Sequence, residues 1–150
     1  MTEATRALGL VLKNDTYELA RFSEAVEDFA ERNDFSEKDT YEIQLCLEEV
    51  FMNVVNYGFD DLDEHDIQVD LQLGDDNRTL VVRVVDDGRP FDPLAGAQDS
   101  DLDTLLEDHA MGGIGYRLVH KYVDDISYQH QDGRNHLILT KKVAAQEAAD

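Results

Sequence analysis

The sequence has few of the residues that mark secreted, zinc-binding or nucleic-acid-binding chains. A single cysteine, Cys46, excludes an internal disulfide and a cysteine zinc site. Only 13 of the 150 residues are Lys or Arg against 34 Asp or Glu, and the net charge of −21 disfavours binding to DNA, RNA or anionic membranes. No apolar run approaches the roughly 18 residues that span a bilayer. The first ten residues lack signal-peptide features, so we expect a cytoplasmic protein.

The rest of the composition suits one globular domain. A hydrophobic content of 42% supplies a core for a chain of this length. Only 2 residues are Pro and 9 are Gly, so no stretch is typical of an interdomain linker. We therefore predict one domain over residues 1–143, with residues 144–150 as a C-terminal tail.

Hydrophobic periodicity and turn residues predict the elements of an α+β fold. Asn14 or Asp15 is expected to cap the first helix, and Ser36 with Asp39 the second, which Gly58 ends. Clean alternation over 66–73 and an Asp132-Gly133 turn indicate antiparallel hairpins. The prediction is a two-layer α/β sandwich, with helices covering one face of a mostly antiparallel, mixed sheet. Strands are expected at 5–12, 66–73, 80–86, 126–130 and 136–142, and helices at 15–32, 37–57 and 115–122.

The predicted helix 37–57 carries two separate stripes of side chains. Its apolar stripe, typical of a core-facing surface, consists of Ile43, Leu47, Val50 and Val54. The second stripe is mostly polar and consists of Glu42, Cys46, Glu49, Asn53 and Asn56. It is either an ordinary solvated face or the wall of a cleft, where a carboxylate needs a partner, a metal or water. Cys46 either packs in the core or lines that cleft.

Two glycine-containing segments add candidate binding residues. Alternation in strand 80–86 places Arg83 on the exposed face and Asp86 on the inner face, with Gly88 allowing close approach of a flat ligand. The alternative is a simple Asp-Asp-Gly turn. Further on, the segment 112–115, Gly-Gly-Ile-Gly, opens a predicted helix and is either an anion site or a hinge.

Together, in order and spacing, these segments resemble the N, G1 and G2 boxes of the GHKL ATPase superfamily, whose fold is called the Bergerat fold. The string Asp-Asp-Gly-Arg-Pro-Phe-Asp-Pro at 86–93, and Asn135 before the last predicted strand, resemble the small bacterial anti-sigma factor serine kinases. The absence of a preceding dimerisation helix with a phospho-accepting histidine favours a stand-alone regulator. The residues that match the boxes are Glu49, Asn53, Asp86, Gly88, Gly113, Gly115 and Leu118.

The resemblance implies ATP and Mg²⁺ as ligands and assigns roles to matching positions. Asn53 would coordinate Mg²⁺ between the phosphates, and Asp86 would accept a hydrogen bond from the adenine amino group above Gly88. Glu49 would orient or deprotonate a serine hydroxyl, while Arg89, Arg117 or Lys121 would help to balance the phosphate charge. The remaining nucleotide-binding positions implied are Asn56, Gly113, Ile114, Gly115 and Tyr116.

The implied function is an ATP-binding anti-sigma factor that acts as a serine/threonine protein kinase. Its expected partners are an anti-anti-sigma antagonist, a sigma factor and, as a homodimer, a second copy of the chain. The segment 92–111 lacks Lys and Arg, which motivates the alternative of a non-catalytic, nucleotide-dependent partner-switching module. A third hypothesis is a metal hydrolase that uses the carboxylates of Glu48, Glu49, Asp86 and Asp87.

Overall fold

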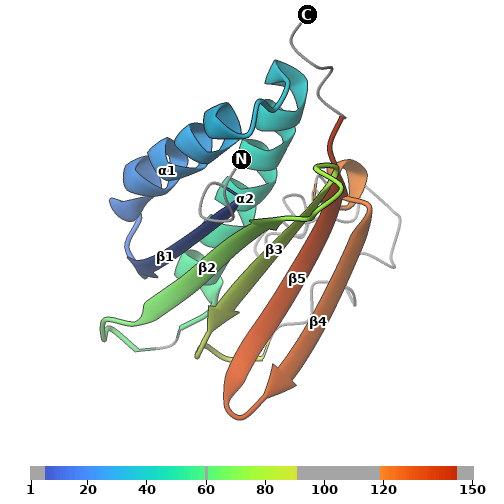
Figure 1. Ribbon diagram of the computed structural model, residues 1–150. Helices are drawn as coiled ribbons and strands as arrows, with labels where there is room; N and C mark the ends of the chain where they lie inside the picture. Colours follow the sequence, from blue (N-terminus) through green and yellow to red (C-terminus); the bar gives the residue numbers. More distant parts are fainter. Residues whose placement is uncertain (1–5, 60, 91–118, 145–150) are drawn as a thin grey trace, which may run out of the picture.

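The protein is an α+β sandwich in which two helices cover one face of a five-stranded sheet (Figure 1). The computed structural model describes residues 6–59, 61–90 and 119–144. The elements, in chain order, are β1 (Ala7–Lys13), α1 (Glu18–Arg32), α2 (Glu37–Tyr57), β2 (Asp66–Leu73), β3 (Thr79–Asp86), β4 (Asp125–Gln131) and β5 (Arg134–Lys142).

The sheet has the strand order β1-β2-β3-β5-β4, which places β1 and β4 at its edges. Every pair of neighbouring strands is antiparallel, so the described sheet is antiparallel throughout rather than mixed. The predicted Asp132-Gly133 turn joins β4 to β5, and both residues have a positive φ, 57° and 75°, as a two-residue hairpin turn requires. The α+β prediction is confirmed, and the chain has the two-layer architecture that the sequence indicated.

The core lies between the helices and the inner face of the sheet. Ile67, Val69 and Leu71 of β2 alternate with exposed or half-buried neighbours, as the sequence pattern predicted. Register places Val69 beside Val84 of β3, so inward residues of adjacent strands form continuous rows. These rows and the apolar stripe of α2 enclose one core cluster, which also contains Phe22 and Phe29 of α1.

Helix α2 begins and ends where the sequence predicted. The side chain of Ser36 accepts a hydrogen bond of 3.0 Å from the backbone N–H of Asp39, which is the expected N-cap. At the other end, the N–H of Gly58 donates to the carbonyl of Val54. This helix carries Glu49 and Asn53, so these two candidate site residues lie about one helical turn apart.

Several predicted boundaries were wrong, and β3 and β4 are each longer than predicted, by one residue at the start of β3 and by one at each end of β4. Helix α1 begins at Glu18, because Asp15 accepts a hydrogen bond from Tyr17 N–H and forms a turn that precedes the helix instead of capping it. Strand β1 ends at Lys13, one residue later than predicted, because Lys13 pairs with Asp66 of β2. Strand β5 already includes Asn135, because this residue pairs with Asp86 of β3.

Some predictions fall outside the described residues. Of the helix predicted at 115–122, residues 119–122 are described, and they are helical. The first two residues of the strand predicted at 5–12 are Thr5, which is outside, and Arg6, which precedes β1. Most of the predicted tail, residues 145–150, is also outside. Within the described ranges, none of the helices combines the length and apolar character needed to cross a membrane.

Candidate functional site

Asp86 is a buried carboxylate at the inner end of β3. Its side chain is on the face opposite Arg83, which is exposed, as strand alternation predicted. In the described part of the chain Asp86 accepts two hydrogen bonds, both at Oδ1: from Asn135 Nδ2 at 2.9 Å and from the Gly88 N–H at 2.8 Å. Burial raises the pKa of the Asp86 carboxyl above its ordinary value, and these two donors act in the opposite direction.

The loop that follows Asp86 packs against the C-terminal end of α2. The Arg89 N–H donates to the carbonyl of Gly58 at 2.8 Å, and Arg89 Nε donates to the carbonyl of Tyr57 at 2.7 Å. A methyl group on Gly88 would lie 2.5 Å from the Gly58 carbonyl oxygen, so only glycine fits between the loop and the helix. These contacts bring the predicted G1 segment to the end of the helix that carries the predicted N-box residues.

The polar stripe of α2 divides into a structural half and a candidate half. Lys141 Nζ of β5 donates to Glu42 Oε1 at 2.9 Å, and both side chains are nearly buried. Cys46 is 1% exposed within the core, where burial raises the pKa of its thiol to about 11. The packing interpretation of Cys46 is therefore confirmed, and Glu42 has the partner that a carboxylate there requires.

The second half of the stripe contains the residues predicted to act on the phosphates. Glu49 is half-buried and Asn56 is exposed. Asn53 is buried, and its Nδ2 donates to the carbonyl of Glu49 at 2.7 Å. Because the amide group is planar, this bond turns Asn53 Oδ1 away from the helix backbone, where it is available as an oxygen ligand.

These residues fit a magnesium ion that is held mainly by a nucleotide. Mg²⁺ prefers oxygen ligands and usually keeps water and phosphate in its shell, so one amide oxygen from Asn53 is a sufficient protein contribution. Among the described residues, no three His, Cys, Asp or Glu side chains gather into a group that could hold a metal by themselves.

The four carboxylates of the metal-hydrolase hypothesis do not converge. Glu48 accepts a hydrogen bond from Ser23 Oγ of α1 at 2.7 Å, so it faces the neighbouring helix. Asp87 Oδ1 lies 3.0 Å from His65 Nδ1 and is exposed, whereas Asp86 is buried and hydrogen-bonded to Asn135 on the other face of the strand. That hypothesis is wrong, because Glu48 and Asp87 are directed away from Asp86.

Asn135 was noted only as part of the family resemblance, with no assigned role, yet its side chain donates directly to Asp86. Asn135 is 7% exposed, and its Nδ2 also lies within hydrogen-bonding distance of the carbonyl oxygens of Gly88 (3.2 Å) and Arg89 (3.0 Å). Tyr128 of β4 donates its hydroxyl proton to Asn135 Oδ1. The sequence signal for Asn135 was the family resemblance, and the structure shows this residue on the inner face of β5 with Leu137 and Leu139.

The cations expected near the phosphates differ in their surroundings. Arg89 uses part of its guanidinium to cap the C-terminal end of α2, where a positive charge is favourable. Lys121 Nζ lies 5.5 Å from the ring centre of Tyr122. Arg117 lies outside the described residues, as do Gly113, Ile114, Gly115, Tyr116 and Leu118 of the predicted G2 box.

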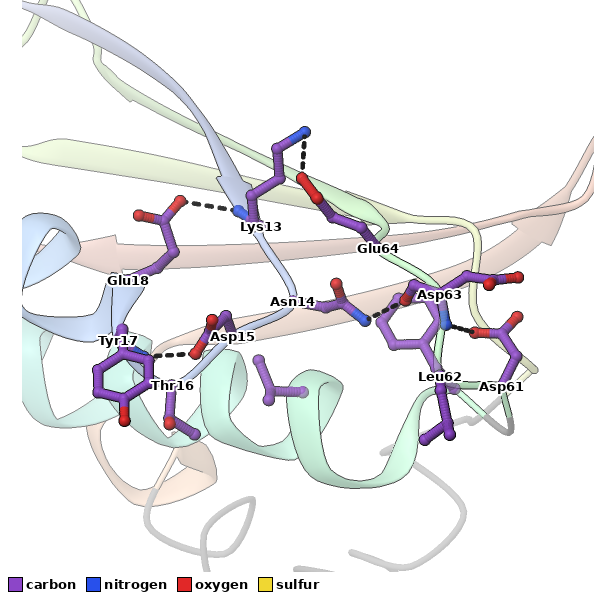
Figure 2. Close-up of a pocket in the computed structure, with 12 residues that line it drawn as sticks. Lys13, Asn14, Asp15, Thr16, Tyr17, Glu18, Asp61, Leu62, Asp63 and Glu64 are labelled. Atoms are coloured by element: carbon purple, nitrogen blue, oxygen red, sulfur yellow. Dashed lines mark hydrogen bonds and ion pairs between the residues drawn. The ribbon is translucent and has the colours of Figure 1, made fainter.

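A separate cleft of about 720 Å³ is unsuited to a nucleotide (Figure 2). It lies between the segment from Lys13 to Glu18 and the segment from Asp61 to Glu64, and five carboxylates line it. Lys13 is the only cationic side chain among its described lining residues, and it pairs with Glu64. Such a surface repels phosphate groups, so the predicted site at Asp86 and Asn53 is the better candidate.

Several known proteins are similar to this chain. Residues 12–141 match the family model described as "Histidine kinase-like ATPase domain". The chain is 31% identical over 139 residues to the serine/threonine-protein kinase BtrW of Bordetella bronchiseptica, covering 88% of this chain and 96% of the relative. The histidine kinase domain of the Erythrobacter litoralis EL346 blue-light activated histidine kinase has the same fold, with a TM-score of 0.53 at 16% identity. That match covers 83% of this chain and 59% of the solved chain.

Proposed function

Since this chain belongs to the histidine kinase-like ATPase domain family, whose members bind ATP, we propose that it is a serine/threonine protein kinase. In this proposal the kinase acts as an anti-sigma regulatory factor. It would sequester a sigma factor and phosphorylate an anti-anti-sigma antagonist. One observation carries the proposal: the Asp86–Arg89 loop contacts the C-terminal end of α2, the helix that carries Glu49 and Asn53. A relative named a serine/threonine-protein kinase supports it.

The residues divide the work of phosphoryl transfer between binding and positioning. Asp86 would accept the adenine amino group, and Asn53 would supply an oxygen to Mg²⁺, which neutralises phosphate charge when bound. The serine Oγ of the antagonist forms a bond to the γ-phosphorus while the bond to the bridging oxygen breaks, and ADP leaves. Glu49, one helical turn before Asn53, would orient the serine hydroxyl and take its proton.

The proposed partners suit the charge of the chain. A net charge of −21 favours a basic partner surface, and a sigma factor carries such a surface where it meets DNA. We place this regulator in the cytoplasm, where ATP and sigma factors are present, and expect it to work as a homodimer.

Phosphorylation of a co-encoded antagonist by the purified protein with Mg-ATP tests the proposal. We expect Glu49→Gln to lower the rate by a factor on the order of 10² to 10⁴, the usual contribution of a positioned general base. Glu48→Gln is the matched control, because this adjacent carboxylate binds Ser23 of α1 and should leave the rate within about twofold.

Two results would contradict the proposal. Equal rates for Glu49→Gln and the wild type would remove Glu49 from the reaction. Partner binding that depends on ATP, without phosphoserine formation, would replace the kinase with a non-catalytic partner-switching module.

A further inference from the structure

Tyr128, Asn135 and Asp86 form a hydrogen-bonded series across three strands. The Tyr128 hydroxyl of β4 donates to Asn135 Oδ1 of β5, and Asn135 Nδ2 donates to Asp86 Oδ1 of β3. The register of the sheet supports this series, because Asn135 pairs directly with Asp86. Three adjacent strands therefore hold these side chains in fixed relative positions.

The surroundings of Asn135 determine the direction of its amide group. Three acceptors lie within 3.2 Å of Nδ2: Asp86 Oδ1 and the carbonyl oxygens of Gly88 and Arg89. A flipped amide would place its oxygen against all three, which is repulsive. The amide of Asn135 is thus a fixed donor toward Asp86 and toward the loop that follows it.

Asp86 is correspondingly fixed as an acceptor. Asn135 and the Gly88 N–H both donate to Oδ1, and neither bond uses Oδ2. Burial and the neighbouring charge of Asp87 raise the pKa of the Asp86 carboxyl. The two donors at Oδ1 and the nearby His130 act in the opposite direction and favour the ionised carboxylate. An ionised carboxylate can only accept, so Oδ2 suits an amino group and opposes a carbonyl oxygen.

We propose that Asn135, with Tyr128, is a positioning residue that presents Asp86 Oδ2 to the 6-amino group of a purine nucleotide, and thereby sets selectivity for adenine over guanine. This inference rests on the proposed function, because it concerns the same nucleotide site. Guanine has an oxygen at position 6, which an ionised Asp86 repels. Without the Asn135 donor, the Gly88 N–H alone holds Asp86 Oδ1, and the protonated form of the carboxyl, which can donate to that oxygen, is less disfavoured.

The test compares the affinities of ATP, GTP and purine riboside triphosphate, which lacks the 6-amino group, each with Mg²⁺. Calorimetry would be carried out on the wild type, Asn135→Leu and Tyr128→Phe. Gln129→Ala serves as the control, because Gln129 lies on the exposed face of the same hairpin. Unfolding curves would establish that each variant is folded.

We expect Asn135→Leu to reduce the ratio of the affinity for ATP to the affinity for each other nucleotide by about tenfold or more. A loss of this size is usual when a hydrogen bond to a charged group is removed. Tyr128→Phe should reduce it about threefold, because Asn135 keeps its three acceptors. Gln129→Ala should keep the wild-type preference. A structural role alone would weaken all three nucleotides equally and leave the ratios unchanged.

Unchanged ratios in Asn135→Leu would overturn the inference while leaving the proposed ATP-dependent function intact. If Asn135→Leu does not fold, an unchanged ratio in Tyr128→Phe overturns it instead. Wild-type protein that binds none of the three nucleotides would overturn the proposed function, and the inference with it.

Discussion

Gly88 shows how one residue joins two parts of the site. A side chain there would meet the Gly58 carbonyl oxygen at 2.5 Å and Asp86 Oδ1 at 2.9 Å. From the sequence, the glycine at this position was explained by the close approach of a flat ligand. The structure adds a second reason, since the end of α2 and the Asp86 carboxylate already occupy the space of a methyl group.

His65 forms a charged cluster outside the candidate site. Its Nε2 lies 2.7 Å from Asp61 Oδ1 and its Nδ1 lies 3.0 Å from Asp87 Oδ1, while its ring stacks on Phe59. A neutral imidazole carries one N–H, so both hydrogen bonds to ionised carboxylates require the charged ring. Asp61, followed by Asp87, raises the pKa of His65, and His65 lowers the pKa of Asp61.

This cluster predicts a pH dependence of stability. The raised pKa of His65 stabilises the fold at pH values below about 6.5, and this contribution is lost as pH rises through the folded-state value. The lowered pKa of Asp61 adds a contribution that is present above about pH 4 and is lost in more acidic solution. Urea unfolding should therefore show a larger deficit for His65→Gln at pH 5.5 than at pH 9.

Asp61→Asn provides the matched variant for this prediction, because it removes the carboxylate that raises the pKa of His65 most and leaves the ring in place. It should also be more destabilising at pH 5.5 than at pH 9. A deficit of the same size at both pH values in His65→Gln would show that the ring contributes through packing on Phe59 rather than through its charge.

Among the elements, α2 and β5 are joined by an ion pair that crosses the core. Lys141 Nζ donates to Glu42 Oε1 at 2.9 Å and to the carbonyl of Tyr122 at 2.8 Å. The lysine therefore also holds the end of the helical segment 119–122 against the sheet. This segment directly follows the predicted G2 box, so the pair supports the side of the domain from which the phosphate contacts are expected.

Breaking this pair on one side should be costly. Lys141→Met or Glu42→Leu is expected to lower the free energy of unfolding by about 3 kcal/mol, because each leaves a nearly buried charge without its partner. The double variant Glu42→Leu with Lys141→Met should recover most of that loss. Chemical denaturation of all four proteins measures the coupling, and additive losses in the double variant would contradict the assignment.

Prediction from sequence worked where one periodicity dominated an element. The stripes of α2 and the alternation of β2 and β3 gave the correct faces, including the inward Asp86. The start of α1 was wrong because Asp15 forms a local turn, and local hydrogen bonds of this kind compete with helix capping. Asn135 and Lys141 gained their roles from partners distant in sequence, Asp86 of β3 and Glu42 of α2, which no local pattern reveals.

In the molecule as a whole, the acidic cleft and the candidate nucleotide site lie on different segments, so a chain with a large negative charge can still offer a site for an anionic nucleotide. The acidic cleft between Lys13–Glu18 and Asp61–Glu64 is formed by other segments than those that carry Asp86 and Asn53. Two of the three segments that carried the family resemblance are described: 49–53 lies within α2, and 86–88 belongs to the loop that packs against the C-terminal end of this helix. The third, at 113–118, lies outside the described residues.

The most direct test of the central claim is the affinity for Mg-ATP of the wild type, Asp86→Asn and Asp87→Asn, measured by calorimetry. The account predicts that Asp86→Asn binds Mg-ATP at least about tenfold more weakly, because a charge-assisted hydrogen bond to the base is lost. Asp87→Asn removes the same charge one residue away, on the exposed side, and should bind within about twofold of the wild type. Equal affinities of the two variants, or no binding by the wild type, would contradict the account.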